Sequence, residues 1–118
     1  MYKRQGLHAE GGIRNLLSRA VENPGFHHFA TDIEGRYFIS DNGPLDQRCE
    51  LVFARLGEPG RDALQNVTYL MKPGTSGRPG VHSHPFLSPD GKMAFFNSDE
   101  SGILQAYMIR NLPVLGTN

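Results

Sequence analysis

An internal repeat constrains the fold of this chain more than any other feature of its sequence. Each copy contains a histidine, a glycine seven residues later and then a basic residue: His28, Gly35 and Arg36 in the first copy, and His84, Gly91 and Lys92 in the second. The copies are 56 residues apart without a gap, and an apolar segment follows the basic residue in each. Repeats of about 40–50 residues with four short strands are typical of β-propeller blades. The alternative is two unrelated hairpins that share a common type of turn.

Strand patterns recur along the chain and are separated by turn-forming clusters. Gly and Pro are 22 of the 118 residues, a share well above the average for soluble domains. The expected strands are 13–18, 27–31, 37–41, 49–56, 67–71, 82–87, 93–97 and 104–110. Residues 13–18 also carry the one helical pattern in the chain, so that segment is the most ambiguous. The sequence therefore predicts an all-β fold.

The repeat predicts a single partial propeller domain over residues 1–118. We expect one four-stranded antiparallel blade at about 26–72, a second at about 81–112, and an outer strand of a preceding blade plus a linker in 1–25. A propeller needs at least four blades to close its ring, and an open pair leaves apolar faces exposed. We therefore expect a fragment of a larger propeller, either the C-terminal part of a longer chain with N-terminal blades or a chain that self-associates.

Charge and composition limit the classes of partner and compartment. The chain has 12 basic and 12 acidic side chains, so it lacks the excess of positive charge that favours nucleic acid or an anionic membrane surface. No apolar run is long enough to span a bilayer, and no signal peptide is visible. The single cysteine, Cys49, suits a reducing compartment and has no obvious base partner for nucleophilic catalysis. We expect a cytoplasmic protein that binds neither nucleic acid nor membrane.

Three histidines predict a metal site. His82 and His84 form a His-x-His pair on the expected strand 82–87, and residues two apart on a strand point to the same face. His28 has the equivalent place in the preceding blade, and equivalent inner strands of a propeller face one central channel. Three neutral imidazoles with an open position suit Mn, Fe, Ni or Zn. The alternative is that these histidines only pack and hydrogen-bond; His27 should face away from His28 and serve packing.

The histidine segments resemble the last two blades of oligogalacturonate lyases. Residues 82–102, together with 105–110, resemble the last blade, and residues 28–41 resemble the preceding one. The Ser-Pro-Asp-Gly-Lys element alone occurs in many TolB-like propellers, whereas the His-x-His-Pro that precedes it, combined with the upstream histidine, is more specific. The resemblance covers roughly residues 12–112 and corresponds to the C-terminal portion of a seven-bladed family.

The resemblance implies a site and a reaction. It matches His28, His82 and His84 to the metal-binding histidines of the family, whose usual ion is Mn²⁺. The family has a glutamine three residues before the first histidine of the pair, where this chain has Pro79, which cannot ligate through its side chain. The catalytic base of the family is a histidine of an earlier blade, and none of the five histidines here matches it.

The implied activity is metal-assisted β-elimination of oligogalacturonides in pectin degradation, with this chain expected to be inactive alone. One alternative is a non-catalytic TolB-like propeller module that binds a partner through its channel or loops. Another is a metal-dependent enzyme on the same scaffold that acts on a different sugar acid, which the proline at position 79 would permit.

Overall fold

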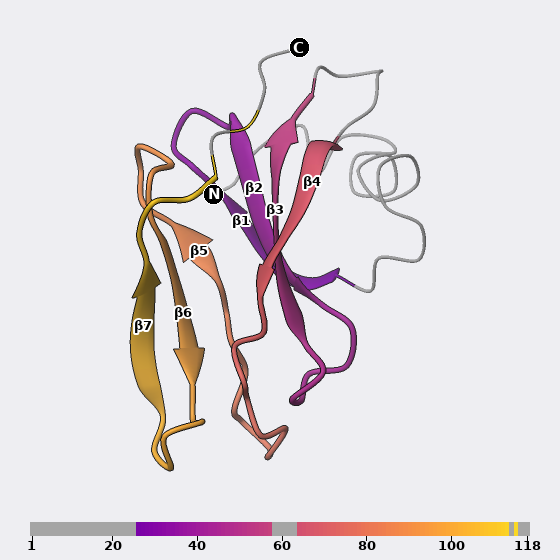
Figure 1. Cartoon of the computed structure of the whole chain (residues 1–118), viewed down its shortest axis with the longest axis vertical. Coiled ribbons are helices and arrows are strands. Elements are labelled where there is room, and N and C mark those ends of the chain that lie inside the picture. Colours follow the sequence, from indigo (N-terminus) through magenta and orange to yellow (C-terminus); the bar gives the residue numbers. More distant parts are fainter. Residues whose placement is uncertain (1–25, 58–63, 114, 116–118) are drawn as a thin grey trace.

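Seven strands form two antiparallel sheets in this computed structural model, which describes residues 26–57, 64–113 and 115 (Figure 1). The predicted all-β fold is confirmed for these residues, which contain no helix. Accordingly, none of them belongs to a helix that could span a membrane. The expected strand at 13–18 lies outside the described residues.

The first sheet is a meander whose strands pair in sequence order. Its strands are β1 (Phe26–Thr31), β2 (Tyr37–Asn42), β3 (Glu50–Leu56) and β4 (Leu64–Met71). They confirm the four strands predicted for this region to within three residues. The central strands β2 and β3 are covered on both faces, which explains why their buried residues form continuous runs rather than strict alternation.

The second sheet has three strands in the part of the chain that the structure describes, so the expectation of four is wrong there. They are β5 (Phe86–Leu87), β6 (Ala94–Ser98) and β7 (Gln105–Ile109), paired in that order. The predicted strand 82–87 shrinks to two residues because His84 has a φ of 43°, a left-handed conformation that interrupts an extended strand. Ser83 nevertheless lies beside β6, since its carbonyl accepts a hydrogen bond from the Asn97 backbone N–H (2.8 Å).

The repeat has a structural counterpart in the two hairpins. The cross-strand pair Ala30–Ile39 recurs 56 residues later as Phe86–Phe95, with no change of register. The turns of the two hairpins also match: each glycine N–H donates to a carbonyl three residues earlier, and each first turn residue accepts a second bond from the backbone five residues later. The two copies therefore share one hairpin-and-turn geometry.

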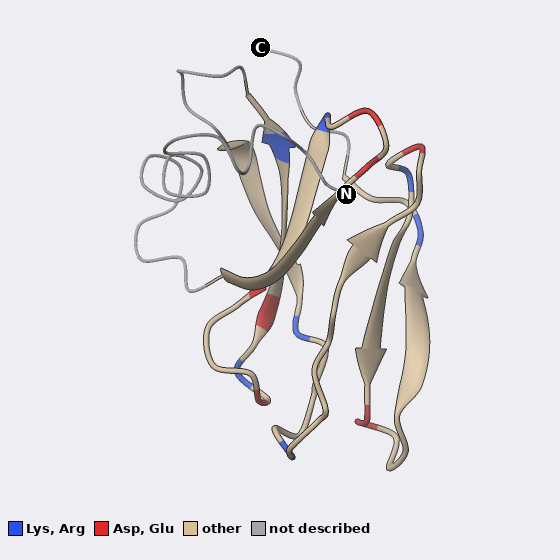
Figure 2. Ribbon diagram, turned by 180° about the vertical axis from the view of Figure 1, so that it is seen from behind, with Lys and Arg blue, Asp and Glu red and all other residues tan. Residues whose placement is uncertain are grey.

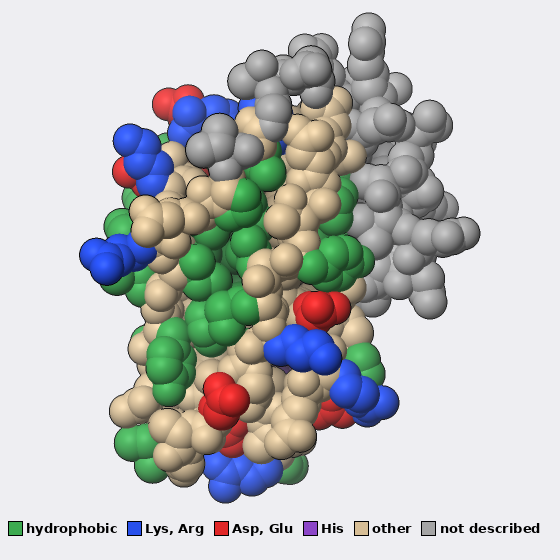
Figure 3. All heavy atoms as spheres, viewed as in Figure 1, with side chains coloured by type: hydrophobic (Ala, Val, Ile, Leu, Met, Phe, Trp, Pro, Cys, Tyr) green, Lys and Arg blue, Asp and Glu red, His purple; other side chains and the backbone are tan. Residues whose placement is uncertain are grey.

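The main core lies between the two sheets. Ile39 and Phe53 of the first sheet pack with Leu87 and Ala94 of the second, and Leu115 joins them. Figure 3 shows hydrophobic side chains gathered along this junction, with charged side chains around its margin. Figure 2 shows acidic and basic residues mainly in the turns at both ends of the sheets, with the two signs interspersed.

The outer faces of the two sheets differ. On the outer face of the first sheet, Phe38, Ala54 and Leu64 form a second buried cluster. On the outer face of the second sheet, Phe86 and Met108 are each 52% exposed, beside a hollow of about 250 Å³. The molecule therefore presents an apolar sheet face to solvent.

Candidate metal centre

The imidazole rings of the three predicted ligands meet at the junction of the two sheets. Ring centroids lie 4.1 Å apart for His28 and His84, 5.3 Å for His28 and His82, and 5.6 Å for His82 and His84. One nitrogen from each ring lies within 4.8 Å of the others. Three nitrogens that share one ion at about 2.1 Å lie about 3–4 Å apart, so the observed separation is close to what a shared ion requires.

The cluster is open on one side. His28 and His82 are partly buried, whereas His84 is exposed. In the part of the chain described, the group contains no cysteine or carboxylate ligand. Three imidazoles with an accessible face leave room for water or a substrate oxygen, which is the arrangement of catalytic rather than structural metal sites.

The backbone route that brings His82 and His84 together differs from the one expected. The prediction relied on alternation along a strand, but residues 82–84 lie outside β5, and His84 has positive φ. Ser83 between them is buried, at 1% exposure, so the chain bends around an anchored residue. The two rings do lie close together, but strand alternation is not the reason for it.

A β-bulge presents His28 to the cluster. The register of β1 with β2 shifts between Phe26 and Phe29, so that two residues of β1, His27 and His28, oppose the single residue Asp41. A bulge of this kind re-aims side chains and leaves local backbone groups unpaired. Here His27 turns outward, as predicted, and its Nε2–H donates to a backbone carbonyl in the loop after β2 (2.6 Å). It is exposed, so the predicted packing role is wrong.

The backbone groups exposed by the bulge find side-chain partners on β2. The His28 N–H donates to Oδ1 of Asp41 (2.8 Å), and the His28 carbonyl accepts from Oγ of Ser40 (2.7 Å). Both β2 side chains are fully buried, at 0% exposure. Both backbone groups of His28 therefore have a hydrogen-bond partner despite the bulge.

Asp41 is the residue of this site that the sequence reasoning missed. Its Oδ2 accepts hydrogen bonds from Nδ1 of His28 and from Oγ of Ser83, both at 2.8 Å. The sequence placed it only as the last residue of an expected strand. The signal that could have identified it is the polar pair Ser40-Asp41, which ends a strand that is otherwise apolar and central to the sheet.

Electrostatics favour a neutral imidazole at His84. Although His84 is exposed, partial desolvation of its ring lowers its pKa from the ordinary value of 6.5. The neighbouring rings of His28 and His82 lower it further, while the Asp41 carboxylate acts in the opposite direction. Metal ligation needs the unprotonated ring nitrogen, so this shift extends the pH range in which His84 can bind an ion.

Cys49 lies near this site but remains a thiol. Burial, followed by the negative charge of Asp41, raises its pKa to about 11. A thiolate is the reactive form of cysteine, so little of Cys49 is in that form at neutral pH. Pro79, which stands where the resembled family has a glutamine, is exposed in the loop before His82.

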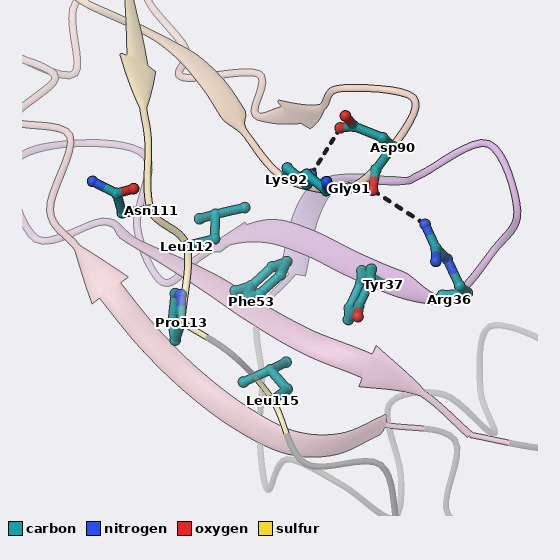
Figure 4. Close-up of a pocket in the computed structure, with 10 residues that line it drawn as sticks. All are labelled: Arg36, Tyr37, Phe53, Asp90, Gly91, Lys92, Asn111, Leu112, Pro113 and Leu115. Atoms are coloured by element: carbon teal, nitrogen blue, oxygen red, sulfur yellow. Dashed lines mark hydrogen bonds between the residues drawn. The ribbon is translucent and has the colours of Figure 1, made fainter.

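A cavity of about 630 Å³ lies at the other end of β2 from Asp41 (Figure 4). Tyr37, Phe53 and Leu112 line its apolar part, and Arg36 spans one rim by donating to the Asp90 carbonyl (3.1 Å). Arg36 also pairs with Asp32 (3.0 Å), so its charge is already compensated. No histidine lines this cavity, which is therefore separate from the imidazole cluster.

Comparisons with known proteins add no relative: no protein-family model matches the chain, and no curated protein or solved structure is significantly similar to it. The likeness of the His-x-His-Pro segment to oligogalacturonate lyases is therefore a prediction from the motif alone.

Proposed function

We propose that His28, His82 and His84 bind one divalent transition-metal ion. The observation that carries this proposal is the convergence of three imidazoles from two sheets, with one nitrogen of each within 4.8 Å of the others. Imidazole nitrogen is a ligand for Mn, Fe, Ni and Zn alike, so the donor set alone does not select the ion. The resemblance of the motif to oligogalacturonate lyases favours Mn²⁺.

The geometry supports a metal site better than simple packing. Stacked or hydrogen-bonded histidines in a core normally satisfy their ring nitrogens with protein groups. Here Nδ1 of His28 has such a partner in Asp41, and the described hydrogen bonds give its Nε2 none. Partial desolvation and the neighbouring rings also hold the pKa of His84 below its usual value, which keeps a lone pair available on that ring.

The proposed reaction of the complete enzyme is β-elimination from an oligogalacturonide. A base removes the C5 proton of a uronate, the C4–C5 double bond forms, and the bond from C4 to the glycosidic oxygen breaks. The leaving oxygen keeps the bonding electrons and takes up a proton, so the products are a hydroxyl group and an unsaturated sugar. A bound divalent ion would stabilise the negative charge that develops next to the uronate carboxylate. The three histidines of this chain would hold the ion beside that carboxylate, and the base would come from a blade outside the residues described.

We also propose that the two sheets are blades of a larger propeller. Ala30 and Ile39 pack against the second sheet, whereas their repeat equivalents, Phe86 and Phe95, line the apolar outer face of that sheet. A further blade on this face would repeat the junction already present between the two sheets. It would come from N-terminal blades of a longer protein or from a second copy of this chain.

Calorimetric titration with Mn²⁺ tests the metal site. We expect saturable binding of one ion per chain, lost in His82→Ala and His84→Ala and kept in His27→Ala, which removes an imidazole adjacent to the cluster but outside it. Circular dichroism on each variant checks that the sheets are intact. Absence of binding by the folded wild-type chain, or binding that survives both ligand substitutions, contradicts the proposal.

Titration with galacturonate oligomers tests the substrate class. We expect binding that depends on Mn²⁺ and disappears in His84→Ala, the most exposed of the three ligands. Preference for another uronate would instead favour a related enzyme with a different sugar acid. Indifference to every uronate in the presence of Mn²⁺ would favour the non-catalytic binding module.

A further inference from the structure

One buried carboxylate connects the two parts of the histidine cluster. Asp41 has 0% exposure, and its oxygens accept three hydrogen bonds, each 2.8 Å long: from the His28 N–H, from His28 Nδ1 and from Ser83 Oγ. A buried charge is costly unless such partners surround it. Two of these donors belong to β1, and the third lies between His82 and His84.

We propose that Asp41 is a positioning residue that prepares the cluster for metal binding before any ion arrives. It does so by selecting the tautomer of His28 and by tying the segment 82–84 to β1 and β2 through Ser83. This inference rests on the proposed metal site, because positioning has a functional meaning only if the three rings share an ion.

The tautomer follows from hydrogen-bond chemistry. An ionised carboxylate only accepts hydrogen bonds, so the His28 nitrogen that faces it, Nδ1, must carry the proton. In the neutral ring the lone pair then lies on Nε2, the nitrogen that this contact leaves available to a metal. Carboxylate–histidine pairs of this kind orient ligands and increase their basicity in metal sites.

The connection through Ser83 determines the spacing of the ligands. Oδ2 of Asp41 accepts hydrogen bonds from both His28 Nδ1 and Ser83 Oγ. One oxygen atom therefore connects the ligand of the first sheet to the segment that carries the other two histidines. The Asn97 N–H also donates to the Ser83 carbonyl, which joins the same segment to β6. Asn97 is also the repeat equivalent of Asp41, so the second copy has a neutral amide at the position where the first has a charge.

The first test reads the tautomer of His28 in the metal-free protein by long-range ¹H–¹⁵N correlation spectra. At a pH where the ring is neutral, we expect a protonated Nδ1 and a bare Nε2 in the wild-type chain. In Asp41→Asn, the amide oxygen can accept from the His28 N–H while its NH₂ group faces Nδ1, so we expect the other tautomer to gain population. A wild-type ring protonated on Nε2, or a ring unaffected by Asp41→Asn, overturns the proposal.

The second test measures Mn²⁺ affinity. Loss of a carboxylate that orients a ligand costs about 10–100-fold in metal affinity, and we expect a loss of this size in Asp41→Asn and a smaller one in Ser83→Ala. Asp32→Asn is the matched control, because Asp32 is also a buried carboxylate that accepts backbone N–H bonds, but it lies in the first turn. Equal losses in Asp41→Asn and Asp32→Asn would indicate a general effect on folding and overturn the proposal.

The two measurements separate this inference from the proposed function. If the wild-type chain binds no Mn²⁺, the metal site is wrong, whereas the tautomer measurement still decides whether Asp41 controls His28. If Mn²⁺ binds with unchanged affinity in a folded Asp41→Asn chain, the metal site stands and the positioning role is wrong. Ser83→Ala, which deletes one hydroxyl, supplies the affinity measurement if Asp41→Asn does not fold, and an unchanged affinity there refutes the tie through Ser83.

Discussion

Ile39 and Phe95 are equivalent residues of the two repeats that face different surroundings. Each belongs to one of two matched cross-strand pairs: Ile39 pairs with Ala30, and Phe95 pairs with Phe86. Ile39 is completely buried between the sheets, whereas Phe95 lines the hollow on the outer face of the second sheet. The face of the first sheet that packs against the second sheet is therefore equivalent to the face that the second sheet exposes to solvent.

We expect this open face to cause self-association of the purified chain. Phe86 is 52% exposed, so Phe86→Asp removes apolar surface without disturbing the core and should shift the chain toward monomer. Sedimentation velocity over a range of concentrations measures this. Ile33→Asp is the control, because Ile33 is 79% exposed in the turn between β1 and β2 and does not line the hollow on that face. A wild-type chain that is monomeric at every concentration contradicts the prediction.

The junction between the sheets should dominate stability. Phe53 is 1% exposed, packs in the central cluster and stacks on Tyr37 with ring centroids 5.6 Å apart. Phe53→Ala should lower the free energy of unfolding by about 3–5 kcal/mol, the usual cost of removing a buried aromatic ring. Urea denaturation measures this loss, and Ile33→Ala on the exposed turn should change stability by less than about 0.5 kcal/mol. A Phe53→Ala loss no larger than that of the control would show that the sheets do not pack as described.

Two glycines with positive φ allow the cost of backbone strain to be measured apart from the cost of a steric clash. Gly91 has a φ of 74°, and an added Cβ would lie 2.8 Å from Cδ2 of Tyr37; Gly102 has a φ of 107° and open space at that position. Gly102→Ala should cost about 1–2 kcal/mol from backbone strain alone. Gly91→Ala should cost about 1–3 kcal/mol more, because the new methyl group overpacks the contact between the two hairpins. Equal losses in urea denaturation would contradict this contact.

The sequence predicted the features of the site that depend on local patterns and missed those that depend on contacts between residues far apart in the chain. The repeat and the His-x-His spacing predicted that His28, His82 and His84 meet, because both are visible in the chain itself. The bulge in β1 and the bend at His84 were not predictable, since tertiary hydrogen bonds stabilise both. Asp41 is 13 residues from one of its partners and 42 from Ser83, so the polar pair Ser40-Asp41 could mark it as unusual but could not identify its partners.

The strands, too, were predicted well where local pattern determines them and poorly where tertiary contacts do. Apolar runs with flanking turns predicted the four strands of the first sheet, and in β2 and β3 burial on both faces reinforces the local pattern. The pattern at 82–87 looked equally extended, but the contacts of Ser83 with Asp41 and with Asn97 favour a bend before Phe86. Local propensity therefore predicted the sheets better than it predicted the segment that carries the site.

The loop between β2 and β3 should respond to acid through Asp46. Hydrogen bonds from the side chain and backbone N–H of Arg48 lower the pKa of Asp46 to about 2, from 3.8. A carboxyl whose pKa is depressed in the folded chain adds stability above its unfolded pKa, and this stability disappears as the pH falls from about 4 to about 2. A carboxyl ¹³C titration should show the low midpoint. Arg48→Ala should raise it, and an unchanged midpoint would show that the pair does not form in solution.

Cys49 should be unreactive in the folded chain. Burial, reinforced by the charge of Asp41, raises its pKa to about 11, so the thiolate is scarce at neutral pH and the sulfur is shielded from reagents. A raised pKa in the folded state stabilises the fold below the unfolded pKa, near 9, and this contribution is lost as the pH rises toward 11. Thiol labelling at pH 8 should therefore be slow in native protein and fast in urea. Rapid labelling of the native chain would contradict the burial of Cys49 and, with it, the burial of the neighbouring Asp41 carboxylate.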